Sequence, residues 1–181
     1  SGACGESLSW ELTGSVLTIT GSGAMTEYRD GGFAPWHEAR ERITTVVLPQ
    51  GLTTIGKYAF LECAALQSVR IPAACKRIGE YAFAECTALT GVKFTDNFAT
   101  IGAHAFENDA QLKNFKLTYT MTKLGEAAFK GCEALGDQEI SGNIAKLGDE
   151  ALSGTKGTYT VQRNTLAEEF VKTWQLSYKR K

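Results

Sequence analysis

The sequence predicts an α/β repeat fold, a solenoid of stacked coils with a parallel β-sheet, and three observations support this prediction. First, the pair Ile-Gly or Leu-Gly recurs at a constant step of 23 residues. Second, apolar side chains alternate along one part of each repeat, as in a strand with one buried face. Third, apolar residues recur at every third position in the other part, as in a short helix or 3₁₀ turn. A repeat of this size with a strand and a turn is typical of a solenoid.

The constant step aligns the repeats in columns, with one residue of each column in each coil. The Ile-Gly or Leu-Gly pair begins at Ile55, Ile78, Ile101, Leu124 and Leu147. A second column contains Phe60, Phe83, Phe106, Phe129 and Leu152, and a third contains Leu66, Leu89, Leu112 and Leu135. Because stacked coils place equivalent side chains over one another, we expect these apolar columns to form the core.

The strand part of the repeat carries a recognisable spacing of apolar residues. Leu66, Val69 and Ile71 follow the pattern L-x-x-L-x-L. At this repeat length the pattern is the signature of a leucine-rich repeat. The sequence therefore predicts a horseshoe whose parallel sheet lies on the concave face.

The two ends of the chain differ from the repeats and are expected to seal the stack. Residues 1–42 contain two alternating segments that predict a β-hairpin, followed by a short helix after Pro35. Residues 43–158 hold five repeats of 23 residues. Residues 159–181 predict a strand, a helix and a short strand, with Thr165 and Glu168 as a capping box. The three segments form one structural domain, because a solenoid needs covered ends.

Composition and charge exclude several classes of protein. The chain has 181 residues, of which 43% are hydrophobic and 22% charged, as in an ordinary globular protein. Its net charge of -1 gives no basic field for nucleic acid, and no apolar run approaches the length of a membrane span. The chain begins with Ser-Gly-Ala instead of Met, which leaves room for a leader that has been removed.

The four cysteines of the repeats are expected to be packing residues. Cys63, Cys86 and Cys132 share one column, and Cys75 falls in an apolar column. Free cysteine behaves as a small hydrophobe in such a position. Zinc sites use short Cys/His spacings, which these columns lack. A bond between Cys63 and Cys86 on adjacent coils is the alternative that the spacing leaves open.

With these columns in place, the chain resembles the BspA-like bacterial leucine-rich repeats, whose unit reads L-x-x-L-x-L-P-x-x-L-x-x-I-G-x-x-A-F-x-x-C-x-x-L. The resemblance covers Ile43 to about Thr160 and is fullest from Leu66 to Leu89, where Cys75 replaces the usual aliphatic residue. The opening CGESLSWEL is also similar to the segment that precedes such repeats, so Cys4 belongs to that segment. The resemblance implies an exported or cell-surface protein with a role in attachment.

Groups that could form a catalytic site are few, so we expect no enzyme, no cofactor and no metal. The two histidines, His37 and His104, lie in the amino-terminal segment and in a column of tyrosines. Packing or an exposed edge explains His104 better than a role as general base. Glu62 and Glu85 stack in phase, which is more simply a solvated face than an acid/base pair.

The outward-facing strand positions give the candidate binding residues. One column contains Val47, Arg70, Lys93, Lys116, Glu139 and Gln162, and its neighbour contains Thr45, Ser68, Gly91, Asn114, Asp137 and Thr160. Three adjacent cations repel one another, which has two interpretations. The column is either a solvated face balanced by Glu139, or a strip that binds an anion. In the second case Arg70, Lys93 and Lys116 supply charge, and Ser68 and Asn114 supply neutral hydrogen bonds.

The sequence thus predicts a non-catalytic, monomeric binding module that takes part in adhesion or in protein or glycan recognition through the sheet face. The expected partner is a host or cell-surface protein or an acidic glycan, with no nucleic acid and no membrane insertion. A structural spacer or targeting domain of a larger secreted protein is the alternative function.

Overall fold

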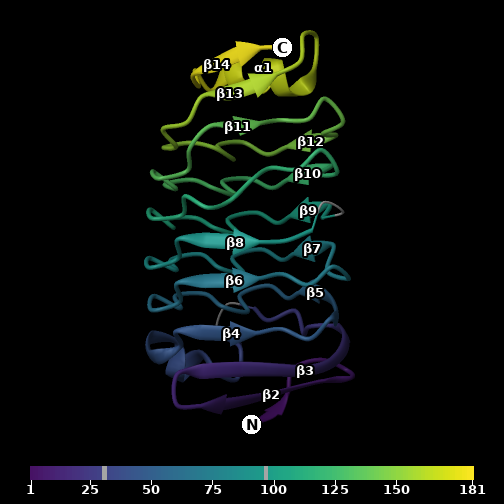
Figure 1. Ribbon diagram of the computed structural model, residues 1–181, viewed down its shortest axis with the longest axis vertical. Helices are drawn as coiled ribbons and strands as arrows, with labels where there is room; N and C mark the ends of the chain where they lie inside the picture. The colour runs from purple at the N-terminus through teal and green to yellow at the C-terminus, as the bar shows by residue number, and fades with distance from the viewer. Residues whose placement is uncertain (30–31, 96–97) are drawn as a thin grey trace.

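The computed structural model describes residues 1–29, 32–95 and 98–181. The chain winds into coils that stack along the longest axis of the molecule, and the two termini lie at opposite ends of the stack (Figure 1). The curvature of a horseshoe, with the sheet on its concave face, stays a prediction.

An antiparallel hairpin begins the fold. Strand β1 (Gly2–Ala3) pairs with β2 (Leu8–Thr13), which pairs antiparallel with β3 (Val16–Ala24). Gly14 forms the turn between β2 and β3 with a φ of 60°, a left-handed conformation that glycine adopts without strain. The predicted hairpin is therefore confirmed. Strand β3 also pairs in parallel with the first two strands of the coils, so it connects the hairpin to the stack.

The coils contribute strands to two sides of the stack. On one side lie β4 (Thr45–Val47), β6 (Ser68–Arg70), β8 (Gly91–Lys93), β11 (Gln138–Glu139), β13 (Tyr159–Val161) and β14 (Tyr178–Arg180). On the other side lie β5 (Gly51–Ile55), β7 (Arg77–Ile78), β9 (Thr100–Ile101), β10 (Lys123–Leu124) and β12 (Lys146–Leu147). Neighbouring coils pair in parallel with a register of 23 residues, as between Ile78 and Ile101. The predicted parallel stacking is confirmed.

The core is a set of side-chain columns that run along the stack. The ring of Phe83 is fully buried and stacks between Phe60, with centroids 5.0 Å apart, and Phe106, 5.3 Å away. Phe129 continues the column at 5.2 Å, and Trp36 begins it at 5.8 Å from Phe60. Each coil therefore buries its aromatic ring against the coils above and below, as the constant spacing predicts.

The turn part of the repeat contains no helix in the part of the chain that the structure describes, so the α/β expectation is wrong for the repeats. Tight turns occupy these positions. Two residues in each coil adopt a positive φ, as Tyr81 at 52° and Glu85 at 61° do in one of them. Such left-handed residues break a helix, and the repeats form a β-solenoid instead.

The invariant glycine after Ile or Leu marks the closest approach between coils. A Cβ atom added to Gly102 would lie 2.7 Å from the backbone nitrogen of Glu80 and 2.9 Å from the carbonyl oxygen of Gly79. The equivalent glycines, Gly56, Gly79, Gly125 and Gly148, would also place a Cβ against the backbone of the preceding coil. Glycine is thus required here because the backbones touch.

The last coil is two residues shorter than the others. Strand β13 pairs with β11 through Gln138 with Tyr159 and Glu139 with Thr160, a step of 21 residues. The predicted columns that place Thr160 beside Asp137 and Gln162 beside Glu139 are therefore wrong. Gly157 makes the shorter path possible, because its backbone lies directly against the carbonyl group of Gly136.

Short helices occur before the first repeat and after the last one. The 3₁₀ helix η1 (His37–Arg42) precedes β4, and the α-helix α1 (Leu166–Thr173) packs against β12 and β13. Thr165 caps α1, since its Oγ1 accepts a hydrogen bond from the Glu168 backbone at 3.3 Å. Glu168 bonds to the backbone nitrogen of Asn164 rather than to that of Thr165. That η1 and α1 seal the stack stays a prediction.

Candidate functional site

The predicted site residues lie on the side of the stack that carries β6 and β8. Ser68 faces Gly91 and Arg70 faces Lys93 across these two parallel strands. The Arg70 and Lys93 side chains are exposed because Val69 and Val92, on the alternate positions, point into the core. The structure therefore brings two of the three predicted cations onto neighbouring strands, about 4.8 Å apart.

The next coil leaves this sheet after a single contact. Asn114 forms an isolated parallel bridge with Gly91, and among the described residues the next strand on this side of the stack is β11. The side chain of Gln138 occupies the place of the missing ladder. Its Oε1 accepts a hydrogen bond from the Leu117 backbone at 2.9 Å, and its Nε2 donates to the Phe115 carbonyl at 3.1 Å. These bonds explain how a buried glutamine is stable in an otherwise apolar column.

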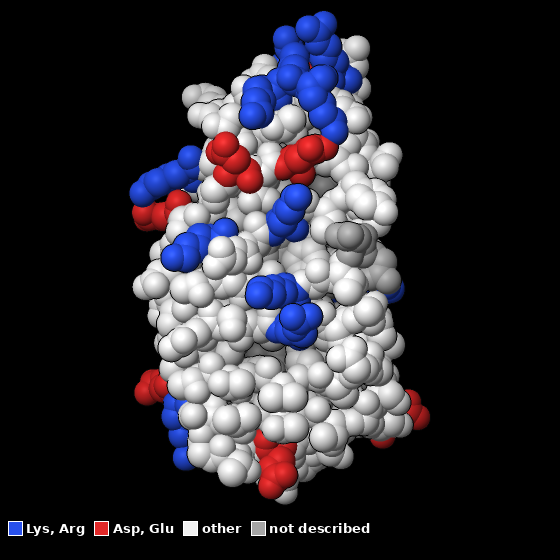
Figure 2. All heavy atoms as spheres, viewed as in Figure 1, with Lys and Arg blue, Asp and Glu red and all other residues white. Residues whose placement is uncertain are grey.

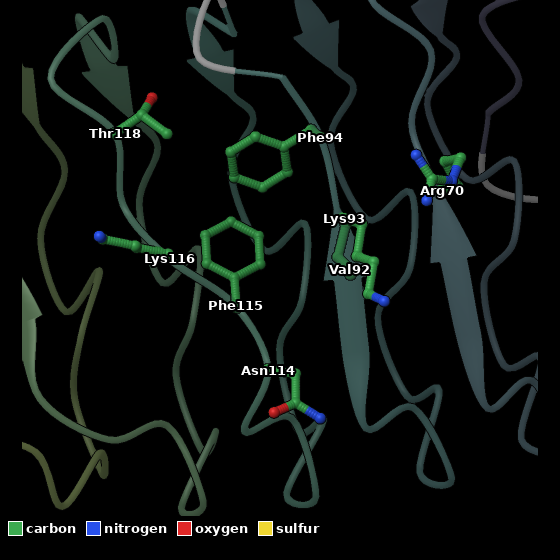
Figure 3. A pocket seen from close by; sticks show the side chains of 8 residues that line it. All are labelled: Arg70, Val92, Lys93, Phe94, Asn114, Phe115, Lys116 and Thr118. Atoms are coloured by element: carbon green, nitrogen blue, oxygen red, sulfur yellow. The ribbon is translucent and has the colours of Figure 1, made fainter.

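A hollow of about 500 Å³ opens where the ladder is interrupted. The three cations border it, together with Asn114 and two aromatic rings (Figure 3). The rings of Phe94 and Phe115 lie between Lys93 and Lys116, with centroids 5.1 Å apart. Lys116 is therefore separated from Arg70 and Lys93 by the hollow, instead of continuing their row at strand spacing.

A second hollow of about 240 Å³ continues the first one toward the carboxyl terminus. Lys116 and Thr118 line both hollows, and Tyr119 and Ser141 line the second. The Tyr119 side chain is 69% exposed, although it is a large aromatic residue. Sequence reasoning missed Tyr119 and the partly buried ring of Phe94 as parts of this surface. The signal available was that Thr118 replaces the proline that ends the strand at Pro72.

The charges on this face are arranged in zones. Figure 2 shows lysine and arginine side chains gathered along the middle of the face, with acidic side chains between them and the basic carboxyl-terminal end. Within the described residues, no ion pair includes Arg70, Lys93 or Lys116, whereas Glu139 pairs with Lys181. This pair lowers the pKa of Glu139. The three cations remain available for an external anion.

The other groups weighed as catalytic candidates have structural partners. The His104 ring stacks on Tyr81 with centroids 4.5 Å apart, and its Nδ1 lies 2.8 Å from Glu107 Oε2. Glu62 accepts a hydrogen bond from Arg40 at 2.8 Å, and Glu85 accepts one from Asn108 at 2.6 Å. Across the described residues, no group of three His, Cys, Asp or Glu side chains could hold a metal ion.

All five cysteines are free and buried, which confirms the expected packing role of the four in the repeats. Burial raises the pKa of the Cys63 thiol to about 12 and that of Cys86 well above its usual value. The Sγ of Cys86 donates to the Phe60 carbonyl at 3.2 Å, and the Sγ of Cys132 donates to the Phe106 carbonyl at 3.0 Å. The alternative bond between Cys63 and Cys86 does not form.

Asp109 interrupts this cysteine column with a fully buried carboxyl group. Its Oδ1 accepts a hydrogen bond from the Cys86 backbone at 2.8 Å, while Oδ2 has no partner among the described residues. Burial raises the pKa of Asp109 well above its ordinary value. A carboxyl group whose pKa is raised in the native state does not lower the free energy of unfolding at a pH below the pKa of the unfolded state. As the pH rises above that value, the group lowers the free energy of unfolding.

We therefore expect Asp109→Asn to raise the free energy of unfolding by about 1–3 kcal/mol at pH 7. The amide keeps the acceptor for the Cys86 backbone and removes the buried acid. The gain over the parent should shrink toward pH 4, where the parent carboxyl is increasingly protonated in both states. Denaturant titrations at pH 7 and pH 4 measure the difference in the free energy of unfolding. Asp109→Cys is the control, because it continues the column of Cys86 and Cys132. A parent as stable as both variants at pH 7 would contradict this interpretation.

Comparisons with known proteins agree with the coil geometry. The family described as BspA type Leucine rich repeat region matches residues 38–159 in six copies. A search of curated proteins finds no match. Among the described residues, no helix is both long enough and apolar enough to cross a bilayer.

Several solved structures of bacterial proteins share the fold. A leucine-rich repeat protein from Eubacterium ventriosum is 22% identical with a TM-score of 0.58, and the match covers 97% of this chain and 38% of that one. The pneumococcal vaccine antigen PcpA is 16% identical with a TM-score of 0.63, covering 96% and 48% of the two chains. The T. pallidum leucine-rich repeat protein is 17% identical with a TM-score of 0.56, covering 99% and 98%.

The chain spans less than half of the first two of these proteins. At such low identities the likeness concerns the fold alone. The matched family extends over most of the sequence and coincides with the stacked coils, and on this ground the chain belongs to the BspA-type leucine-rich repeat family.

Proposed function

We propose that this repeat module binds a polyanionic ligand through the face that carries Arg70, Lys93 and Lys116, as a non-catalytic part of an exported or cell-surface bacterial protein. The observation that supports the proposal most directly is that these three exposed cations border a hollow and form no ion pair within the described residues. Unpaired cations can bind a carboxylate or sulfate without first breaking an internal ion pair, and charge-assisted hydrogen bonds are strong.

A role in adhesion fits this arrangement. The family and the fold are those of repeat modules in bacterial proteins, and one structural neighbour is a pneumococcal vaccine antigen. The second candidate is a spacer or targeting domain, which is favoured by the length of the relatives: this chain spans only part of two of them. A spacer needs no specific ligand on this face, so the two functions are separated by a binding experiment.

Reversing the three charges, by Arg70→Glu, Lys93→Glu and Lys116→Glu together, should weaken polyanion binding by about tenfold or more, since each change replaces attraction with repulsion. Titration calorimetry against poly-L-glutamate, dextran sulfate and polygalacturonate measures the effect. Binding by the parent protein should also weaken as the salt concentration rises, because the charges are exposed and screened.

A matched control carries the same change in net charge on another part of the surface: Lys76→Glu, Lys123→Glu and Lys146→Glu. These lysines are exposed and none belongs to an ion pair within the described residues. The control should retain the parent's affinity. Equal losses in the two triple variants would show that only net charge matters and would favour the spacer.

A further inference from the structure

The basic face also contains features that charge alone does not explain. Two hollows, of about 500 and 240 Å³, meet at Lys116 and Thr118 and form a continuous depression. We call this depression and the three cations that border it, Arg70, Lys93 and Lys116, the basic trough. Its other polar groups are the amide of Asn114, the hydroxyls of Thr118, Tyr119 and Ser141, and the carboxylate of Glu139, which is paired with Lys181.

Aromatic surface is present on the wall and on the rim of the basic trough. The Phe94 ring is partly exposed between Lys93 and Lys116, and Tyr119 stands at the second hollow with most of its surface in water. An exposed aromatic ring beside hydroxyl and amide groups suits a ligand that has both an apolar face and many hydroxyls. A pyranose ring has this character, with C–H groups on its faces and hydroxyls around its edge.

An acidic peptide is less well matched to the basic trough. Extended peptides commonly bind by adding a strand to the free edge of a sheet. Here β6 and β8 already pair with each other, and the Val92 and Ile71 amides donate to Asn114 and Lys93 carbonyls. The Leu117 amide, where the ladder is interrupted, is bonded to the side chain of Gln138. These backbone groups are therefore not available to a peptide that lies across the face.

The spacing of the cations sets the spacing of charge in the ligand. Arg70 and Lys93 lie on adjacent strands, so their Cα atoms are about 4.8 Å apart. A linear polysaccharide with one anionic group on each sugar presents charges at a similar interval. Arg70, Lys93 and Lys116 lie on three successive coils, with the hollow between the first two and Lys116, and would therefore contact a segment of a few sugars.

We propose that the ligand of the basic trough is an acidic saccharide chain with one carboxylate or sulfate on each sugar, and that Tyr119 packs against the face of a sugar ring. The inference rests on the proposed binding function, and it adds the class of the ligand. The three cations bind the acidic groups, Asn114, Thr118 and Ser141 bind hydroxyls, and Tyr119 distinguishes a sugar from other polyanions.

The test compares Tyr119→Ala with Tyr119→Phe, which keeps the ring and removes only the hydroxyl. Binding of polygalacturonate oligomers should weaken about tenfold in Tyr119→Ala and remain near the parent value in Tyr119→Phe. Dextran sulfate distinguishes a sulfated ligand from a uronate, and neutral dextran should not bind. Because Tyr119 is exposed, both variants should keep the melting temperature of the parent.

The outcomes separate this inference from the function on which it rests. Binding of poly-L-glutamate that equals that of the saccharides and is unchanged in Tyr119→Ala would overturn the saccharide class and leave polyanion binding in place. Saccharide binding that is unaffected by Tyr119→Ala would also overturn it. If none of the polyanions binds to the parent protein, both the inference and the proposed function fail.

Discussion

Replacing Phe83 with alanine is expected to lower the free energy of unfolding by about 3–5 kcal/mol, the usual cost of removing a buried aromatic side chain. The ring is fully buried and stacks on Phe60 and on Phe106. Its loss leaves a cavity between two coils, and neither neighbour can fill the space without leaving its own column. Denaturant midpoints of the two proteins, at constant slope, measure the effect.

Phe33→Ala is the matched control for this change, since the Phe33 side chain is 37% exposed. The same atoms are removed, but Phe33 does not belong to the buried core and its ring stacks on His37, so the loss should be well under half of that for Phe83. Equal losses at the two positions would mean that the aromatic column does not hold adjacent coils together.

Gly102→Ala should destabilise the protein by about 3 kcal/mol, at the upper end of the range for overpacking. One added methyl group would lie 2.7 Å from the backbone nitrogen of Glu80. The obstacle is backbone of the neighbouring coil and not the end of a flexible side chain, so the two coils must separate. Separation also lengthens the hydrogen bond of 2.9 Å from the Gly102 amide to the Ile78 carbonyl.

Gly136→Ala gives the same chemical change where no other atom lies within 4 Å of the new methyl group. This variant should be as stable as the parent or slightly more so, because alanine restricts the unfolded chain. Melting curves of the two variants and the parent compare the sites directly. Two similar curves would show that the invariant glycine does not set the distance between coils.

Much of the fold could be predicted because every repeat shows the same requirement, the burial of apolar side chains between stacked coils. Phe83 and its equivalents stack at the spacing of the coils, and the hairpin follows from alternating residues around Gly14. The turns could not be distinguished from helices, since apolar residues at every third position fit both. The left-handed backbone at residues such as Tyr81 and Glu85 makes these segments turns instead of helices. Neither tyrosine nor glutamate is a residue type that indicates a left-handed conformation.

The candidate site was predictable in its charges and not in its shape. Arg70 and Lys93 lie in register as their column predicts. The hollow beside Lys116 depends on Gln138, whose side chain bonds two backbone groups of the preceding coil. In the sequence Gln138 appears only as a polar residue in an apolar column. The exposure of Tyr119 likewise depends on where the chain runs after the sheet is interrupted.

The position of the two termini at opposite ends of the stack has a mechanical consequence (Figure 1). Tension applied between the ends acts along the axis on which the coils are stacked. Hydrogen bonds such as that from the Gly102 amide to the Ile78 carbonyl connect one coil to the next, so the contacts between coils bear the load in series. In a series arrangement every contact carries the whole force, and the weakest one yields first. Resistance to stretching is therefore set by a single interface, however many coils the stack contains.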